Sequence, residues 1–181
     1  EIVDDATGAE LARFGEGYSL AAAYVHDGVF YVTASRFEND DWNDVTLFQS
    51  RDLKTWDSRV IIEQENENLF NSSLCAGPDG FVLAYESNDS RYPAFTTKFA
   101  RSTDLQTWTK APESTFGLDR YTACPFIRYV DGYYYVVYLE ARSPRHYFET
   151  YITRSPDLIH WERSAANPVL APVDIDDGIN T

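Results

Sequence analysis

The chain has 181 residues, of which 44% are hydrophobic and 24% are charged, a composition that favours a folded globular domain over a disordered chain. Its 29 acidic residues outnumber its 15 basic residues, and the formal net charge of -14 excludes nucleic acids and anionic membrane surfaces as partners. No stretch approaches the roughly 20 apolar residues of a membrane span. We therefore expect a single domain over residues 1–181.

A hairpin signature recurs three times along the chain. Asp-Gly occurs at 27–28, 79–80 and 131–132, at intervals of 52 residues, between short apolar runs that are typical of β-hairpins. The paired runs are 20–25 with 29–34, 74–76 with 81–85, and 126–130 with 133–139. A third run follows each hairpin, at 45–49, 97–100 and 150–153.

A second motif, Ser-x-Asp-Leu-x-x-Trp, follows each third run, at 50–56, 102–108 and 155–161. The motif predicts a turn in which the Asp and Ser side chains bind backbone N–H groups, and a fourth strand that opens with the Trp. Its intervals of 52 and 53 residues agree with those of Asp-Gly. Two independent markers in register indicate a true repeat, over residues 18–66, 70–118 and 121–171.

Four antiparallel strands in a unit of about 52 residues are typical of a β-propeller blade. The sequence therefore predicts an all-β fold with three blades, whose innermost strands are 18–25, 71–76 and 122–130. Closed propellers have roughly 4 to 8 blades, so we expect a segment of a larger, five-bladed propeller. The apolar faces of the end blades must then be covered by the remaining blades or by self-association.

The repeat resembles the five-bladed propeller glycosidases of glycoside hydrolase families 43 and 32 and their relatives. The stretch 123–135, Ala-Cys-Pro-Phe-Ile-Arg-Tyr-Val-Asp-Gly-Tyr-Tyr-Tyr, is most similar to them, and the resemblance covers roughly residues 18–180. The family places a carboxylate at the start of several inner strands, and its invertase branch has Glu-Cys-Pro there. The matching positions here are Ser19, Asn71 and Ala123, so the family's catalytic residues do not transfer.

Candidate catalytic residues must lie at the end of the blades opposite the Asp-Gly turns, where the inner strands begin. Glu86 and Glu140 end apolar runs there, at six and eight residues after their repeat Gly, and these even offsets predict one common face. A glycosidase needs two carboxyl groups, one with a raised pKa. We predict that Glu86 and Glu140 are this pair; the alternative is that each makes an ion pair with Arg142 or Arg120.

Asp119 and Arg120 lead into the third inner strand and are predicted to face the central cavity, with Asp119 as a third catalytic candidate and Arg120 as a ligand for sugar hydroxyls or a carboxylate. Their alternative role is to pair with each other. The other predicted substrate-binding residues are polar or aromatic side chains of the same end, namely Arg36, Trp42, Asn71, Tyr121, Arg142 and His146.

The sequence thus predicts a glycoside hydrolase-like enzyme that cleaves a neutral or uronic oligosaccharide or polysaccharide by carboxylate acid/base catalysis. The alternative is a non-catalytic carbohydrate-binding or scaffold propeller. We expect a secreted or periplasmic protein with a carbohydrate substrate and no cofactor, although a structural calcium ion stays open. The acidic run 63–68 is interpreted as a solvated loop, and Cys75 and Cys124 as buried thiols.

Overall fold

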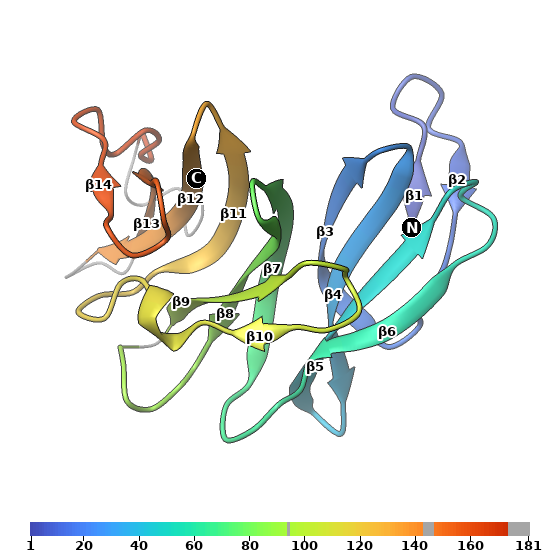
Figure 1. Ribbon diagram of the computed structural model, residues 1–181, viewed down its shortest axis with the longest axis horizontal. Helices are drawn as coiled ribbons and strands as arrows, with labels where there is room; N and C mark the ends of the chain where they lie inside the picture. The colour runs from blue at the N-terminus through green and yellow to red at the C-terminus, as the bar shows by residue number, and fades with distance from the viewer. Residues whose placement is uncertain (94, 143–146, 174–181) are drawn as a thin grey trace.

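The computed structural model describes residues 1–93, 95–142 and 147–173, and this part of the chain is built of strands with one short 3-10 turn at Pro112–Ser114. Three four-stranded antiparallel sheets lie side by side (Figure 1). Blade 1 contains β3 (Tyr18–His26), β4 (Val29–Glu38), β5 (Asp41–Ser50) and β6 (Asp57–Ile62). Blade 2 contains β7 (Leu69–Gly77), β8 (Gly80–Ser87), β9 (Thr96–Ser102) and β10 (Thr109–Lys110). Blade 3 contains β11 (Ala123–Val130), β12 (Tyr133–Arg142), β13 (Tyr147–Ser155) and β14 (Glu162–Arg163).

Each blade runs outward in sequence order, from β3 to β6, from β7 to β10 and from β11 to β14. The first strands of neighbouring blades contact each other, β3 with β7 and β7 with β11. The prediction of three antiparallel blades with these innermost strands is confirmed. No helix in the described part of the chain is long and apolar enough to cross a membrane.

The Ser-x-Asp-Leu motif makes the same turn three times. In blade 2, the Asp104 Oδ1 accepts the backbone N–H groups of Gln106 and Thr107, each at 2.8 Å, and the Ser102 hydroxyl oxygen accepts that of Leu105 at 2.8 Å. Asp52 and Asp157 make the equivalent bonds in blades 1 and 3. The three Asp residues therefore stabilise turns, as the sequence predicts.

The hairpin of blade 2 is one residue out of step with the other two. β3 and β4 join through Asp27-Gly28, and β11 and β12 through Asp131-Gly132, but Gly77 pairs with Gly80 so that Pro78-Asp79 forms the turn. Gly80 is therefore a strand residue. An offset counted from Gly80 therefore corresponds to the opposite strand face from the same offset counted from Gly28 or Gly132.

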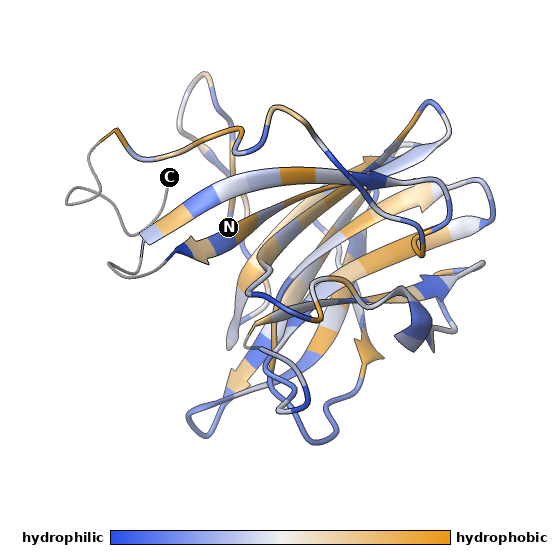
Figure 2. Cartoon of the chain, turned by 90° about the vertical axis from the view of Figure 1, so that its left-hand side faces the viewer, coloured by the Kyte–Doolittle hydropathy of each residue, from blue (hydrophilic) through white to orange (hydrophobic). Residues whose placement is uncertain are grey.

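Apolar side chains fill the two boundaries between blades. Leu74, Leu83 and Tyr85 of blade 2 pack against Tyr31 and Leu47 of blade 1. Alternate residues of the same strand pack the other way, and Val82 and Ala84 join a cluster with Val136 and Tyr138 of blade 3. Figure 2, seen from the side where blade 3 lies, shows apolar residues along the strands and hydrophilic residues at the turns.

The N-terminal segment covers the outer side of blade 1. β1 (Ile2–Val3) and β2 (Glu10–Ala12) pair with each other, and Phe14 follows them. The Phe14 ring stacks on Trp56 with the ring centroids 3.8 Å apart, and it joins a cluster with Val32, Ala34 and Phe48. Blade 1 thus has apolar contacts on both of its faces.

Candidate functional site

The innermost strands begin at the end of the blades opposite the hairpin turns, which we call the site end. The pairing of each innermost strand with its neighbour shifts there, between Ser19 and Ala22, Leu69 and Ser72, and Ala123 and Phe126. Such bulges redirect side chains and are frequent beside active sites. The third bulge contains Cys124, whose φ of 52° is in the left-handed region.

Glu86 is held at this third bulge by two hydrogen bonds. Its Oε2 accepts the backbone N–H of Cys124 at 2.7 Å and the side-chain amide of Asn71 at 2.8 Å. Asn71 also donates to the Cys124 Sγ at 3.4 Å. Glu86 on β8 therefore joins the innermost strands of blades 2 and 3. Ser35 occupies the equivalent place in blade 1, where its hydroxyl donates to the Phe70 carbonyl oxygen.

The environment of Glu86 favours its protonated form. The residue is only 3% exposed, and burial raises the pKa of its carboxyl group, although the hydrogen bonds from Cys124 and Asn71 act in the opposite direction. Both hydrogen bonds end on Oε2. The Oε1 atom accepts no hydrogen bond from the described residues. Oε1 is therefore the oxygen of Glu86 that the hydrogen bonds of the described residues leave unengaged.

Glu140 on β12 has a different environment. It is 4% exposed, and its Oε1 accepts hydrogen bonds from Tyr138 Oη at 2.9 Å and Arg163 Nη2 at 2.8 Å. Arg142 Nη1 lies 3.5 Å from its Oε2, and the same arginine donates to Glu149 at 2.6 Å. Glu140 therefore makes the arginine pairing that was the alternative to catalysis.

The predicted common face of Glu86 and Glu140 is wrong, because the hairpin of blade 2 is shifted by one residue. Glu86 follows Val82 and Ala84 on the face of blade 2 that meets blade 3. Glu140 follows Val136 and Tyr138 on the face of blade 3 that meets blade 2. The two carboxylates enter the same boundary from opposite sides, but no hydrogen bond or ion pair among the described residues joins them.

Asp119 and Arg120 lie on the connection between blades 2 and 3. Arg120 Nη2 is 3.0 Å from Asp119 Oδ1, and the Asp119 side chain is 75% exposed. The Arg120 guanidinium also lies over the Phe116 ring, 6.0 Å from its centroid. Asp119 is thus the accessible one of the three candidate carboxylates.

Aromatic side chains follow one another across the site end. Ring centroids are 4.7 Å apart between Phe37 and Trp42, 6.1 Å between Trp42 and Phe70, and 4.8 Å between Phe70 and Phe95. The series continues at 5.7 Å to Tyr121 and at 5.4 Å to Phe148. We call these six residues the aromatic belt. It contains two predicted substrate-binding residues, Trp42 and Tyr121.

The remaining predicted binding residues are placed as follows. Arg36 pairs with Glu38 at 2.9 Å, Asn71 binds Glu86, and Arg142 belongs to the cluster around Glu140. His146 lies outside the described residues. The roles proposed for these side chains in binding a substrate stay predictions.

Sequence reasoning missed two features of the site end. Cys124 is exposed, so the prediction of two buried thiols is wrong for this residue, whereas Cys75 is buried. In the acidic run, Glu63, Glu65 and Asn66 are exposed as predicted, but Glu67 is not. Glu67 and Asp89 both pair with Lys98, and all three side chains are about nine-tenths buried. Only contacts between distant segments reveal such burial. No group of three or more potential metal ligands occurs among the described residues.

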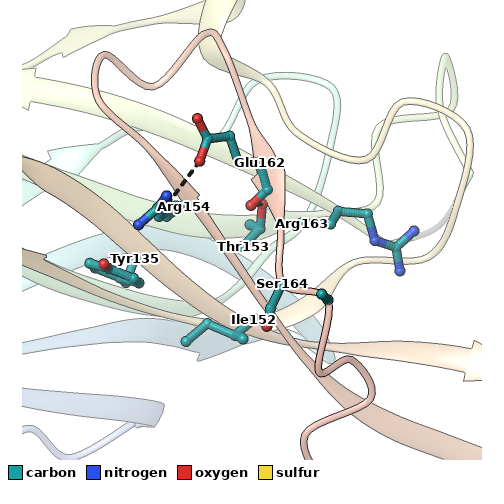
Figure 3. A pocket seen from close by; sticks show the side chains of 8 residues that line it. Tyr135, Ile152, Thr153, Arg154, Glu162, Arg163 and Ser164 are labelled. Atoms are coloured by element: carbon teal, nitrogen blue, oxygen red, sulfur yellow. Dashed lines mark hydrogen bonds and ion pairs between the residues drawn. The ribbon is translucent and has the colours of Figure 1, made fainter.

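A separate cavity of about 300 Å³ opens on the outer face of blade 3, where Tyr135, Ile152 and Thr153 lie beside Glu162 and Arg163 (Figure 3). Arg154 crosses it and donates to Glu162 at 2.9 Å. The residues that line it exclude Glu86, Glu140 and Asp119. The cavity belongs to the face of blade 3 that points away from blade 2.

Comparisons with known proteins give fold relatives only. No protein-family model matches the chain. No curated protein sequence matches it either. A family 117 glycoside hydrolase from the marine bacterium Zobellia galactanivorans superposes with a TM-score of 0.64 at 16% identity, covering 85% of this chain and 57% of the other.

Two further structures give the same result. A Bombyx mori GH32 β-fructofuranosidase has a TM-score of 0.65 at 20% identity, over 81% of this chain and 34% of the other. A GH43 endo-arabinanase from Bacillus licheniformis has a TM-score of 0.56 at 14% identity, over 77% and 51%. The chain therefore has the fold of five-bladed β-propeller glycosidases, and it spans between 34% and 57% of the length of these three.

Proposed function

We propose that this chain is the site-bearing part of a glycoside hydrolase-like propeller and that Glu86 is its proton donor. The observation that supports the proposal is the state of Glu86, a buried carboxyl group of raised pKa. One of its oxygens accepts two hydrogen bonds, and the other accepts none from the described residues. Glu86 lies on β8, the second strand of blade 2, and binds the beginnings of two innermost strands in a fold that glycosidases use. A glycosidase acid requires a carboxyl group that stays protonated near neutral pH.

In this proposal, hydrolysis uses Glu86 as the acid and a second, ionised carboxylate as the base. Glu86 gives the proton on Oε1 to the glycosidic oxygen as the bond from that oxygen to the anomeric carbon breaks. A water molecule supplies the hydroxyl group that replaces it, and an ionised carboxylate takes the water's proton. Burial accounts for the first role, because it disfavours the charged form of Glu86.

We assign the ionised partner to Asp119 rather than to Glu140. Asp119 is exposed to solvent, and Arg120 Nη2 lies 3.0 Å from its Oδ1. Glu140 is buried, and its Oε1 already accepts hydrogen bonds from Tyr138 and Arg163. In this proposal Glu140 is a structural residue that joins β12 to Arg163 on β14, although the sequence predicts a catalytic role for it.

A second candidate function is that of a non-catalytic carbohydrate-binding propeller. It is favoured by the three inner-strand positions Ser19, Asn71 and Ala123, none of which is a carboxylate. Glu86 would then serve only to connect blades 2 and 3, as Ser35 connects blades 1 and 2.

Hydrolysis of arabino-, xylo- and fructo-oligosaccharides, measured by chromatography of the products, separates the two functions. We expect cleavage by the wild type, a loss of at least a hundredfold in Glu86→Gln and Asp119→Asn, and near-normal cleavage in Glu38→Gln, an exposed carboxylate of the same end. Binding of these oligosaccharides without any cleavage would support the carbohydrate-binding function instead.

We also propose that the outer face of blade 3 packs against further propeller blades or a second copy of the chain. Tyr135 and Ile152 line the cavity described above, and Val137, which pairs with Ile152 across β12 and β13, is half-buried. The equivalent face of blade 2 is covered by blade 3. An uncovered blade face exposes apolar area that soluble monomers rarely tolerate.

A further inference from the structure

The aromatic belt contains rings from all three blades, and each ring contacts the next. Phe37 and Trp42 belong to blade 1, and Phe70 and Phe95 to blade 2. Tyr121 lies just before the first strand of blade 3, and Phe148 lies on its third strand, β13. Each residue lies where a strand starts or ends at the site end. The belt therefore crosses all three blades on the same end as Glu86.

Five of the six rings keep exposed surface. Phe37 is 41% exposed, and Trp42, Phe70, Phe95 and Tyr121 are half-buried, whereas Phe148 is buried. Neighbouring rings meet edge to face or at a tilt, with interplanar angles of 51°, 72° and 74° along the middle of the belt. Exposed apolar surface in a continuous row is typical of a binding site.

Tyr121 connects the belt with the catalytic candidate. Its pKa is raised, chiefly by burial and in addition by the negative charge of Glu86 nearby. Phe70 of the belt directly precedes Asn71, whose side-chain amide donates to Glu86 Oε2 at 2.8 Å. A chain molecule lying on the belt therefore passes Glu86.

The charges at this end do not suit an anionic ligand. The arginines that the described residues place here each have a carboxylate oxygen within about 3 Å, as in the pairs Arg36 with Glu38, Arg91 with Asp89, Arg120 with Asp119 and Arg142 with Glu149. Lys98 is paired with Glu67 and Asp89. The formal net charge of -14 adds long-range repulsion of anions.

We infer that the aromatic belt binds a neutral, extended oligosaccharide chain along its length, with several sugar rings lying on successive aromatic rings. This inference rests on the proposed function and narrows its substrate class from neutral or uronic sugars to neutral ones. A row of one exposed ring and four half-buried rings presents apolar surface to the C–H faces of several sugars at once. Affinity therefore grows with the number of sugar units.

Isothermal titration calorimetry with arabino- and xylo-oligosaccharides of one to six units, and with oligogalacturonides of the same lengths, tests this. In Glu86→Gln, used to prevent cleavage, affinity for one neutral series rises at least tenfold from two units to five. The oligogalacturonides bind at least tenfold more weakly than neutral chains of equal length, and the difference grows at low salt.

Belt variants locate the bound chain. Phe95→Ala and Trp42→Ala are each expected to weaken binding of the five-unit chain about tenfold. Tyr133→Ala, which removes a half-buried ring next to the Asp131-Gly132 turn at the opposite end, leaves it within about twofold. Phe95→Leu, which keeps apolar volume while removing the ring, weakens binding like Phe95→Ala if stacking is responsible.

Equal affinity for all lengths, tighter binding of oligogalacturonides, or equal effects of the Phe95, Trp42 and Tyr133 variants would overturn the inference. Cleavage of the same oligosaccharides by the wild type is measured in parallel. Cleavage without any dependence on length overturns the belt and leaves the proposed function intact, whereas absence of both binding and cleavage overturns both.

Discussion

At the scale of single residues, the two glutamates that look alike in the sequence have opposite environments. Glu86 lies among uncharged partners, so its burial raises the pKa and favours the neutral acid. Glu140 is equally buried but touches two arginines, which compensate a negative charge. Burial alone therefore does not identify a proton donor, and the charge of the neighbouring side chains must be considered as well.

The pH dependence of stability tests this reading of Glu86. Because its pKa is raised in the folded protein, the folded state binds the proton more tightly than the unfolded state. Wild-type stability relative to Glu86→Gln is thus highest at low pH. It falls as the pH rises from the ordinary glutamate pKa through the raised one, by at most about 1.4 kcal/mol per pH unit. Urea unfolding of both proteins between pH 4 and 8 measures it, and parallel curves would disprove the raised pKa.

Lys98 on β9 makes buried ion pairs with Glu67 and Asp89 at the site end, and removing it should lower the stability of the folded protein. Lys98→Met leaves the buried Glu67 and Asp89 carboxylates without their shared cation, and we expect a loss of roughly 3 to 5 kcal/mol in the free energy of unfolding. Lys110→Met is the matched control, because Lys110 pairs with the exposed Glu65, and its loss should be below about 1 kcal/mol. Similar losses in both variants would contradict the buried network.

At the scale of elements, the hairpin turns determine which side chains reach the site. Two blades use Asp-Gly, which adopts positive φ at both turn residues, at 49° and 71° in blade 1. Blade 2 uses Pro78-Asp79, and Gly80 enters β8 with a φ of 116°. A shift of one residue reverses the faces of a whole strand.

Gly80→Ala is expected to be more destabilising than Gly132→Ala. A Cβ at Gly80 would lie 2.4 Å from the Ser102 carbonyl oxygen, whereas a Cβ at Gly132 has no atom within 4 Å. Both variants strain a positive φ, but only the first also overpacks β9, for an additional roughly 1 to 3 kcal/mol. Chemical denaturation compares the two, and a larger loss in Gly132→Ala would show that Gly80 is a turn residue after all.

Much of the fold was predictable from the sequence, because its markers are local. Asp-Gly and Ser-x-Asp-Leu-x-x-Trp each act within a few residues, and they predict the blades and their turns. The faces of β8 were not predictable from the Asp-Gly period, because Pro78 moves the turn. The partners of Glu86 and Glu140 were not predictable either, since Cys124 and Arg163 are brought to them by packing between blades and within blade 3.

At the scale of the whole molecule, the two ends of the arc of blades differ. Phe14 and the N-terminal strands cover the outer side of blade 1. A cavity of about 220 Å³ lies there beside Phe14, Tyr18 and Phe48, and one of about 300 Å³ opens on the outer face of blade 3. Because the N-terminal segment already packs on blade 1, we expect association through blade 3.

Sedimentation of the 181-residue chain measures this association. We expect a sedimentation coefficient that rises with concentration in the wild type and a shift toward monomer in Val137→Glu, which places a charge among the apolar residues of the outer face. Val60→Glu, at an exposed position on β6, should leave the association unchanged. A wild type that stays monomeric at every concentration would show that the outer face of blade 3 needs no cover.

The most direct test of the proposed function is a crystal structure of Glu86→Gln with a bound neutral oligosaccharide. We predict that the sugar chain lies on the aromatic belt and that one glycosidic oxygen is within hydrogen-bonding distance of the side chain at position 86, with Asp119 facing the same sugar. A sugar bound only in the cavity on the outer face of blade 3, or one on the belt without any glycosidic oxygen near position 86, would contradict Glu86 as the proton donor.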